Sequence, residues 1–333
     1  MKPVKWGVLS TAKIGLDRVL PAMQRGALCD IAAIASREPE RARAAAAALG
    51  IAKAHDSYEE LLADPDIEAI YNPLPNHMHV EWSARAMEAG KHVLCEKPIA
   101  LTAAEAERLI AVRERTGMRI EEAFMVRNHP QWQAARAWLT EGRIGALQAI
   151  QACFCYRNMN PDDIRNKADI GGGALYDIGS YCITAARYLF DDEPRRAIAL
   201  IDRDPEFGTD RLTSAILDFP AGPASFVCGT QTARFQTVQA LGTKGWFRLE
   251  FPFIMEPENP TRVVFGDGAF PGPQVAETET FEPVNQYTLQ GDNFSRRLRT
   301  GEPAPFPLET AIANMRVIDA LFRSGQTGRW ESV

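Results

Sequence analysis

Residues 90–98 read GKHVLCEKP, a short apolar run followed directly by a Glu-Lys-Pro triplet. The apolar run predicts a buried strand, so Lys97 falls at the strand's C-terminal end. In open parallel α/β sheets this end lines the crevice where ligands bind, because strand ends and helix N-termini converge there. The stretch therefore predicts a parallel α/β sheet with Lys97 at its ligand-binding edge.

The surrounding residues repeat the same alternation of strand and helix. Strands are expected at residues 5–10, 30–36 and 69–72, in the apolar run before Glu96 and at residues 119–124, with helices at residues 16–25, 38–49, 58–63, 79–89 and 103–115. Such alternation predicts a doubly wound parallel sheet with right-handed crossovers, the Rossmann type of dinucleotide-binding domain.

The turn after the first strand is a degraded version of the glycine-rich phosphate loop. Ser10, Ala12 and Gly15 stand where the fingerprint has three glycines, and the turn also contains Thr11 and Ile14. Small residues still let backbone N–H groups at a helix N-terminus face an anion. An ordinary strand-to-helix turn fits these residues equally well, but the position after the first strand favours a dinucleotide.

The end of the second strand, where the ribose of a dinucleotide is read, holds Ser36 and Arg37. An acidic residue there would accept hydrogen bonds from a free 2′-hydroxyl, whereas serine and arginine suit a 2′-phosphate. Arg41, one turn further on, could add a second positive charge. We therefore expect NADP rather than NAD. The alternative is that both arginines pair with Glu38 and Glu40 on a solvated helix start.

Beyond about residue 124 the pattern changes to longer alternating runs punctuated by Gly and Pro. Strands are expected at residues 148–156, 214–219, 224–228, 237–242 and 245–250, with helices at residues 179–189, 285–299 and 310–323. We expect two domains, residues 1–123 for the cofactor and residues 124–333 as an α+β domain for substrate and oligomerisation. Its large, mainly antiparallel open sheet would leave one face free, which favours a homodimer or a higher homo-oligomer.

A second chemical signal lies at residues 169–181, DIGGGALYDIGSY. Asp177 and Tyr181 are four residues apart, so they project from one face if the helix has begun by Asp177. The three glycines allow close backbone approach, as at a domain interface or a cofactor. The alternative makes Asp177 a helix N-cap and Tyr181 a half-buried core residue.

Together these features closely resemble the glucose-fructose oxidoreductase and inositol dehydrogenase family, also called Gfo/Idh/MocA, over essentially the whole chain. The resemblance rests on AGKHVLCEKP at residues 89–98 and GGGALYDIG at residues 171–179. Residues 74–79, LPNHMH, resemble the family's Thr-Pro-Asn-x-x-His loop over the cofactor, with leucine replacing threonine. The resemblance implies that the cofactor also contacts Leu74, Pro75, Asn76, His79, Glu96 and Lys97.

Residues 160–165, NPDDIR, and a tyrosine rather than a histidine at Tyr181 are similar to one branch of the family. That branch contains NADP-dependent D-xylose and other aldose 1-dehydrogenases, glucose-fructose oxidoreductase and dimeric dihydrodiol dehydrogenase. The resemblance implies that Lys97, Asp177 and Tyr181 are catalytic. It makes Arg165 a candidate for positioning substrate or nicotinamide, and it places Arg127 and His129 at the domain junction, where a structural role is equally compatible.

The expected reaction is hydride transfer between NADP and a sugar or related polyol. Tyrosine is a poor base at its ordinary pKa of about 10, and a neighbouring lysine ammonium would favour the phenolate. We expect Tyr181 to accept the proton and Lys97 to assist, although these roles could be shared, with Asp177 orienting the pair. Alternatives are a trans-dihydrodiol dehydrogenase, an oxidoreductase that keeps NADP bound between two sugars, and a non-catalytic sugar-binding or regulatory protein.

Composition is that of an ordinary two-domain globular chain: 333 residues, 46% apolar, 24% charged, net charge −6. This mild acidity and the dispersed Lys and Arg argue against nucleic acid, and no apolar run is long enough for a bilayer. The first strand starts too near Met1 for a signal peptide, so we expect a cytoplasmic protein. The six cysteines have no metal-binding spacing, which predicts reduced core thiols and no metal.

Overall fold

The computed structural model describes residues 1–268 and 277–333, which fall into two compact units. The first unit comprises residues 1–125 and 285–315, and the second comprises residues 126–284 and 316–333. Sequence reasoning divides the chain once, near residue 124, and does not foresee the return of residues 285–315 to the first unit. None of the helices in the described residues is long and apolar enough to cross a membrane.

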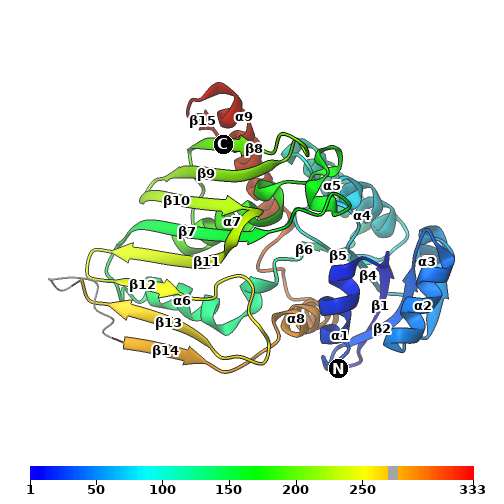
Figure 1. Cartoon of the computed structure of the whole chain (residues 1–333). Helices are drawn as coiled ribbons and strands as arrows, with labels where there is room; N and C mark the ends of the chain where they lie inside the picture. Colours follow the sequence, from blue (N-terminus) through cyan, green and yellow to red (C-terminus); the bar gives the residue numbers. More distant parts are fainter. Residues whose placement is uncertain (269–276) are drawn as a thin grey trace. The chain divides into compact units, whose positions relative to one another are not determined.

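The first unit is built on a six-stranded parallel sheet in the order β3-β2-β1-β4-β5-β6 (Figure 1). Its strands are β1 (Val4–Leu9), β2 (Cys29–Ala35), β3 (Lys53–His55), β4 (Ala69–Asn72), β5 (His92–Cys95) and β6 (Ile120–Glu122). Its helical segments are the π-helical turn η1 (Gly15–Val19), α1 (Leu20–Met23), α2 (Pro39–Leu49), α3 (Tyr58–Ala63), the short η2 (Asn76–Met78), α4 (His79–Glu88), α5 (Ala103–Thr116) and α8 (Gln286–Thr300). The strand order reverses between β1 and β4, which is the switch point where open α/β sheets bind ligands. The predicted parallel sheet is confirmed.

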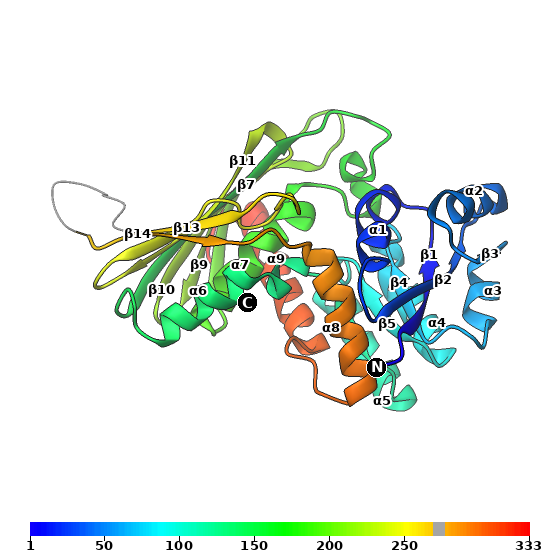
Figure 2. The ribbon, with the colours of Figure 1, turned by 90° about the horizontal axis from the view of Figure 1, so that it is seen from below.

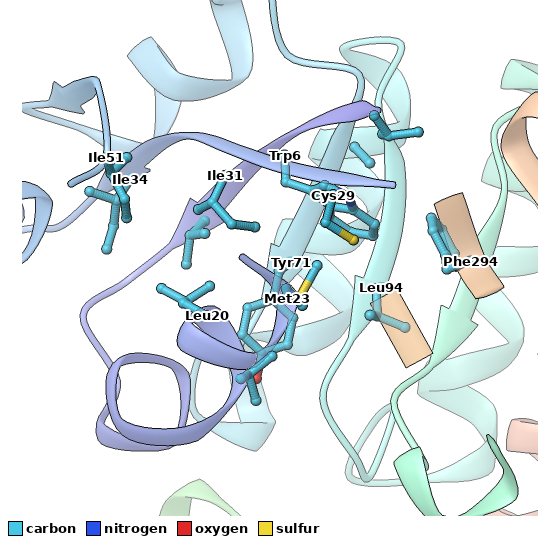
Figure 3. Close-up of a cluster of buried hydrophobic side chains, with 14 of the residues drawn as sticks. Trp6, Leu20, Met23, Cys29, Ile31, Ile34, Ile51, Tyr71, Leu94 and Phe294 are labelled. Atoms are coloured by element: carbon cyan, nitrogen blue, oxygen red, sulfur yellow. The ribbon is translucent and has the colours of Figure 1, made fainter. Parts of the chain in front are cut away.

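A buried apolar cluster joins the sheet of this unit to α1 and α8 (Figure 3). Trp6 on β1 and Phe294 on α8 pack with their ring centroids 5.2 Å apart, and both side chains are buried. The Trp6 indole N–H also donates to the Ser295 hydroxyl at 3.1 Å. Helix α8 therefore completes the core of the first unit, although it follows β6 by more than 160 residues of chain.

Polar contacts also hold α8 in the first unit. The Asp292 carboxylate accepts the N–H groups of Ala27 and Leu28 at 3.0 and 2.8 Å. Arg297 donates to both carboxylate oxygens of Glu121 at 3.1 and 2.6 Å, and both side chains are buried. Loss of either partner would leave a buried charge uncompensated, which is strongly destabilising.

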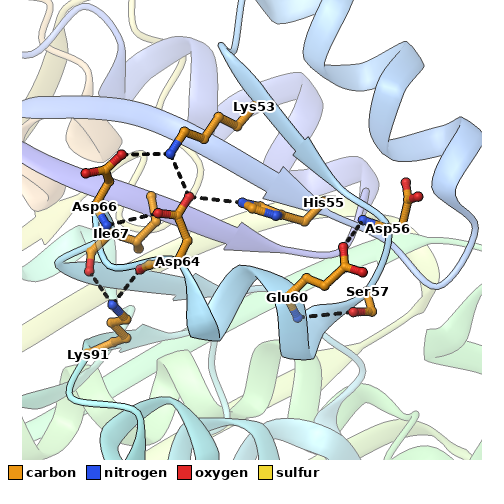
Figure 4. Close-up of polar contacts among 9 residues, drawn as sticks. All are labelled: Lys53, His55, Asp56, Ser57, Glu60, Asp64, Asp66, Ile67 and Lys91. Atoms are coloured by element: carbon orange, nitrogen blue, oxygen red, sulfur yellow. Dashed lines mark hydrogen bonds and ion pairs between the residues drawn. The ribbon is translucent and has the colours of Figure 1, made fainter.

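A polar network ties β3 to the segment that enters β4 (Figure 4). The buried Asp64 carboxylate accepts from Lys53 at 2.9 Å and lies 3.1 Å from Nε2 of His55. Lys91 donates to the backbone carbonyls of Asp64 and Ile67, each at 2.7 Å. Burial raises the pKa of Asp64, but the hydrogen bonds, led by that of Lys53, outweigh it and hold the pKa at about 2.

The second unit contains a nine-stranded sheet in the order β14-β13-β12-β11-β7-β10-β9-β8-β15. Its strands are β7 (Leu147–Arg157), β8 (Arg196–Arg203), β9 (Asp210–Phe219), β10 (Gly222–Gly229), β11 (Gln231–Gly242), β12 (Trp246–Leu249), β13 (Thr261–Gly266), β14 (Glu277–Phe281) and β15 (Glu331–Ser332). Neighbouring strands are antiparallel except for β10 and β7. This confirms the predicted large, mainly antiparallel second sheet.

Helices pack against one face of this sheet (Figure 2). The remaining helical segments are η3 (Met125–Asn128), α6 (Pro130–Thr140), η4 (Ile164–Asn166), η5 (Ala168–Ile170), the π-helical turn η6 (Leu175–Gly179), α7 (Ser180–Phe190) and α9 (Leu308–Thr327). Ala199, Ala215 and Phe226 point to the helical side and are buried. On the other face, the paired strands expose Leu200, Ile216, Val227 and Phe235.

Candidate active site

The loop that carries Lys97 follows β5 and is fixed by the neighbouring strand β4. The Glu96 N–H donates to the Asn72 carbonyl at 3.0 Å, and the Glu96 Oε1 accepts the Tyr71 hydroxyl at 2.6 Å. Burial and then the charge of Glu96 raise the pKa of Tyr71, so this hydroxyl remains a donor. Lys97 follows the end of β5 by two residues, where the sequence places it, and its side chain is half-buried.

Two further contacts hold the residues after Lys97. The Glu122 Oε1, at the end of β6, accepts the Ile99 N–H at 2.9 Å. The His79 ring lies between two backbone carbonyls, with Nδ1 2.7 Å from Pro98 O and Nε2 2.6 Å from Leu74 O. His79 thus ties residues 74–79, predicted to cover the cofactor, to the lysine loop.

His79 is completely enclosed, which sets its protonation. Burial lowers the pKa of His79 to about 4, although both carbonyl contacts favour the protonated ring. A neutral imidazole carries a single N–H, so it can donate to only one of the two carbonyls at a time. We expect the neutral ring at pH 7, because the cost of burying an unpaired charge exceeds the gain from one further hydrogen bond.

The turn that would face a pyrophosphate is tight despite its missing glycines. Ser10 has a φ of +77°, a conformation that residues other than glycine rarely adopt. Its N–H donates to the Ala35 carbonyl at 2.9 Å, and its hydroxyl accepts the Ala12 N–H at 3.2 Å. Thr11 and Ile14 are partly exposed, and Gly15 begins the helical turn η1. Ser10 therefore makes the turn that the fingerprint assigns to its first glycine.

The end of β2 has the charge pattern expected for a 2′-phosphate. Ser36 is buried and its hydroxyl accepts the Glu38 N–H at 3.2 Å, whereas the Arg37 side chain is exposed. Burial raises the pKa of the adjacent Tyr58, and the charge of Arg37 opposes that rise. No carboxylate occupies position 36 or 37.

Of the two arginines expected to bind the 2′-phosphate, Arg41 makes an ion pair with a neighbouring glutamate, as the alternative interpretation proposes. Arg41 contacts Glu38 at 3.0 Å, with both side chains mostly exposed, whereas Glu40 pairs with Arg43. Exposed pairs of this kind contribute about 0–1 kcal/mol, so Arg41 could exchange Glu38 for a stronger anion at little cost.

The second unit brings Asp177 together with two other polar side chains. The Asp177 Oδ2 accepts the Tyr156 hydroxyl at 2.5 Å and the Arg165 Nε–H at 3.0 Å. The charge of Asp177 raises the pKa of Arg165, and burial followed by the same charge raises the pKa of Tyr156. Arg165 thus stays a cation and Tyr156 a neutral donor, which favours an ionised Asp177.

Tyr181 lies one helical turn after Asp177 and faces the same strand. Phe154 and Tyr156 are two residues apart on β7 and so share a face of the strand. The Phe154 and Tyr181 rings pack edge to face with their centroids 5.6 Å apart. Phe253 packs against Tyr181 from another side, also at 5.6 Å. Tyr181 is buried, as the core alternative proposes, yet it belongs to the same helix and the same side of the sheet as Asp177.

The three glycines bring Arg165 close to this helix. Gly173 and Gly172 donate to the carbonyls of Arg165 and Lys167 at 2.8 and 2.9 Å. A Cβ on Gly172 would lie 2.6 Å from both carbonyl oxygens. At Gly172 the close approach is therefore to this unit's own backbone.

Arg127 and His129 are buried where α6 begins. The His129 ring accepts the Gln131 N–H at 3.2 Å and so caps the helix, and burial lowers the pKa of His129 to about 4. These observations favour the structural role left open for His129. Lys97 lies in the first unit, whereas Arg127, His129, Arg165, Asp177 and Tyr181 lie in the second.

Sequence reasoning misses two residues of this second cluster, Tyr156 and Asp210. Tyr156 lies near the end of a predicted strand, and alternation with Phe154 was the available signal. Asp210 begins β9 and accepts the Leu175 N–H at 2.6 Å, a contact between residues 35 positions apart that no local pattern reveals.

A parallel sheet with a dinucleotide-type turn, followed by a second unit that presents polar side chains, defines a nucleotide-dependent oxidoreductase class. The family described as "Oxidoreductase family, NAD-binding Rossmann fold" matches residues 4–124, and the "GFO/IDH/MocA C-terminal domain" matches residues 132–248. The chain belongs to the Gfo/Idh/MocA family of oxidoreductases. The resemblance drawn from the sequence is thereby confirmed.

Individual relatives extend over the whole chain. An uncharacterized oxidoreductase of Rhizobium meliloti is 48% identical over 100% of both chains. D-xylose 1-dehydrogenase (NADP(+)) 2 of Haloferax volcanii is 37% identical over 97% of this chain and 98% of its own. The crystal structure of KijD10, a 3-ketoreductase from Actinomadura kijaniata in complex with NADP and TDP-benzene, superposes with a TM-score of 0.89 at 30% identity, covering 97% of this chain and 98% of that one.

Proposed function

We propose that this enzyme is an NADP-dependent dehydrogenase that transfers hydride between nicotinamide and a sugar, of the aldose 1-dehydrogenase type. The observation that carries the proposal is the cluster of Tyr156, Arg165 and Asp177 beside the helix that bears Tyr181. Such a set of charged and hydroxyl groups on one side of a sheet suits a polyhydroxylated substrate. The Haloferax D-xylose dehydrogenase and the NADP complex of KijD10 support the sugar and the cofactor.

The residues of the first unit fit NADP. Ser10 makes the tight turn at the switch point, and the end of β2 presents a buried serine and the exposed Arg37 without a carboxylate. A 2′-phosphate would gain charge-assisted hydrogen bonds from Arg37 and from Arg41, whose Glu38 pair is weak. Leu74, Pro75, Asn76 and the Glu96-Lys97 pair would hold the nicotinamide half.

The proposed catalytic residues divide the work on the substrate hydroxyl. When bound, NADP supplies the hydride acceptor. Tyr181, as its phenolate, would take the hydroxyl proton, the Lys97 ammonium would stabilise that phenolate, and the ionised Asp177 carboxylate would orient the pair. Structures of KijD10 include a tyrosine-to-phenylalanine variant and a lysine-to-alanine variant. These variants support the proposal that a tyrosine and a lysine are the residues to test in this chain.

Arg165 is proposed to position the substrate. Its guanidinium is held by Asp177 and Asp163, with Nη1 3.3 Å from the latter, and its side chain is about one-third exposed. A planar donor fixed in this way can hydrogen-bond vicinal hydroxyls without losing much conformational entropy. Arg127 and His129 remain candidates for substrate contacts, with the helix-capping role of His129 the better supported.

The test is absorbance at the NADPH band with purified protein, NADP and a panel of aldoses plus one cyclic trans-diol, repeated with NAD. Growth of the band with an aldose and NADP is the expected result. Growth with the diol alone would identify a dihydrodiol dehydrogenase instead. Absence of growth in folded protein would point to a cofactor kept between turnovers, detectable as NADP released on denaturation, or to a non-catalytic sugar-binding role.

We also propose that the face of the nine-stranded sheet opposite its helices forms a homodimer. It exposes Leu200, Ile216, Val227 and Phe235, which monomeric proteins seldom gather on one face. Sedimentation analysis should give the dimer mass, and Leu200→Glu, at a side chain that is 78% exposed, should shift it toward the monomer without lowering the melting temperature of the isolated chain. A monomeric wild type would reject this proposal.

A further inference from the structure

Asp210 is a buried carboxylate that the proposed reaction does not use. It begins β9 and is 1% exposed. Its Oδ2 accepts the Leu175 N–H at 2.6 Å and lies 3.4 Å from the Thr213 hydroxyl. Leu175 is the first residue of η6, the helical turn that contains Asp177 and leads into the helix of Tyr181.

The carboxylate also explains the last glycine of the triplet. Gly173 has a φ of +117°, and a Cβ there would lie 1.9 Å from the Asp210 Oδ1. The two oxygens therefore face the start of the helix from Gly173 to Leu175. The Gly173 N–H donates to the Arg165 carbonyl, and the Gly173 carbonyl accepts the Asp177 N–H at 3.1 Å. Asp210 thus contacts the segment to which both Arg165 and Asp177 are joined.

We propose that Asp210 is a positioning residue of the candidate active site, whose charge holds the helix start so that Asp177 and Tyr181 keep their alignment. The inference rests on the proposed function for the roles of those two residues. A negative charge at a helix N-terminus interacts favourably with the N–H groups there, although burying this charge costs the fold as a whole more than the local contact returns. Loss of the charge would weaken the hold on the Leu175 N–H and loosen the turn that carries Asp177.

The surroundings place the titration of this group near neutrality. Burial raises the pKa of Asp210 to about 7, against the Leu175 N–H and the charge of Arg203, which lower it. The facing groups are Arg203 on β8, paired with Asp210 across the strands, and Cys228 on β10. The helical turn η6, which meets Asp210 through the Leu175 N–H, carries Asp177, and the Asp177 Oδ2 accepts the Arg165 Nε–H.

A raised carboxyl pKa has a definite consequence for stability. Between the unfolded pKa of about 4 and the folded pKa of about 7, the folded state binds the extra proton, so stability falls as pH rises through this window. A carboxylate kept at such a cost is typical of a functional site rather than of a structural cap.

Asp204 supplies a matched control on the hairpin between β8 and β9. It is also buried, and it caps the turn by accepting the Glu206 and Phe207 N–H groups at 2.8 Å. Those backbone hydrogen bonds, with that of Gln231, lower the pKa of Asp204 rather than raise it. Replacement of the two residues should therefore change stability in opposite directions.

The experiment compares Asp210→Asn with Asp204→Asn and the wild type. At pH 8 we expect Asp210→Asn to melt at a higher temperature than the wild type and Asp204→Asn at a lower one. Hydrogen exchange of residues 175–181 should accelerate about 5- to 30-fold in Asp210→Asn, the range expected for a partly buried charge at a helix N-terminus, and should not change in Asp204→Asn.

With an active substrate, Asp210→Asn should lower kcat more than it raises KM, and the acidic limb near pH 7 should disappear from its kcat profile. Unchanged exchange at residues 175–181, or an unchanged limb, would overturn the proposal. The melting and exchange measurements need no substrate, so they decide on Asp210 even if the proposed sugar oxidation fails.

Discussion

The Tyr156 hydroxyl lies 2.5 Å from the Asp177 Oδ2, the same oxygen that receives the Arg165 Nε–H. Two donors from different segments, one neutral and one cationic, thus define the direction in which this carboxylate points. Because one oxygen receives both donors, each donor's contribution depends on the presence of the other.

Tyr156→Phe should lower kcat/KM about 10- to 100-fold, the equivalent of a hydrogen bond to a charged group of roughly 1.5–3 kcal/mol. Arg165→Lys should also be impaired, because lysine cannot reproduce the planar guanidinium contact. The double variant should lose less than the product of the two single losses. The measurement is the steady-state kinetics of the wild type, the two single variants and the double variant. Strictly multiplicative losses of kcat/KM would show that the two donors act independently.

Tyr181→Phe should retain NADP binding but lose most of kcat, about 10²- to 10⁴-fold, because the proton acceptor is removed while the aromatic packing against Phe154 and Phe253 remains. Fluorescence titration with NADPH and turnover assays separate the two effects. Tyr188→Phe, on the same helix, is the control and should keep nearly full turnover. Normal turnover in Tyr181→Phe would remove this residue from the mechanism.

Arg37→Ala should weaken NADP binding by at least about tenfold while leaving NAD binding nearly unchanged, because only NADP carries the 2′-phosphate that Arg37 would pair with. Arg43→Ala is the matched control, since Arg43 lies on the neighbouring helix and is engaged by Glu40 and Asp56. Dissociation constants from calorimetry decide the matter. Equal losses for both cofactors in Arg37→Ala would contradict the assignment.

Asp64→Asn should destabilise the protein at pH 7 by roughly 1.5–3 kcal/mol, since hydrogen bonds from Lys53 and His55 to a charged carboxylate are lost. The folded pKa of Asp64, about 2, is depressed, so its contribution is present above about pH 4 and disappears as pH falls toward 2. Urea unfolding across this range should show the difference from wild type shrinking. Asp66→Asn, whose side chain is 55% exposed, should cost much less.

Much of the fold could be predicted because local patterns sufficed. The helix at residues 58–63 and the strand at residues 69–72 have the predicted bounds. Strand β3 was missed because three residues with partly exposed side chains give no apolar signature. Helix α6 was missed as well, since its proline start and mixed surface resemble a loop entering the second sheet.

The candidate site shows the same division between local and distant information. Lys97, Asp177 and Tyr181 lie in short motifs, so the sequence singles them out. Tyr156 and Asp210 reach Asp177 and Leu175 only through strands that lie 21 and 35 positions away in the sequence. Their roles depend on register between strands and helix, which a single sequence does not encode in any short pattern.

The buried pair of Arg297 and Glu121 limits which segments this protein can exchange with its relatives by recombination. The nucleotide-binding half is not one continuous module, because α8 supplies Arg297, Asp292 and Phe294 from far along the gene. Replacing residues 1–124 by those of a relative would remove Glu121 and leave the buried Arg297 without its carboxylate, unless the relative supplies an acidic residue at that position. A change of cofactor preference is therefore expected to arise from point substitutions at the end of β2, or from recombination that exchanges residues 1–124 and α8 together. Exchange of the N-terminal segment alone should not suffice.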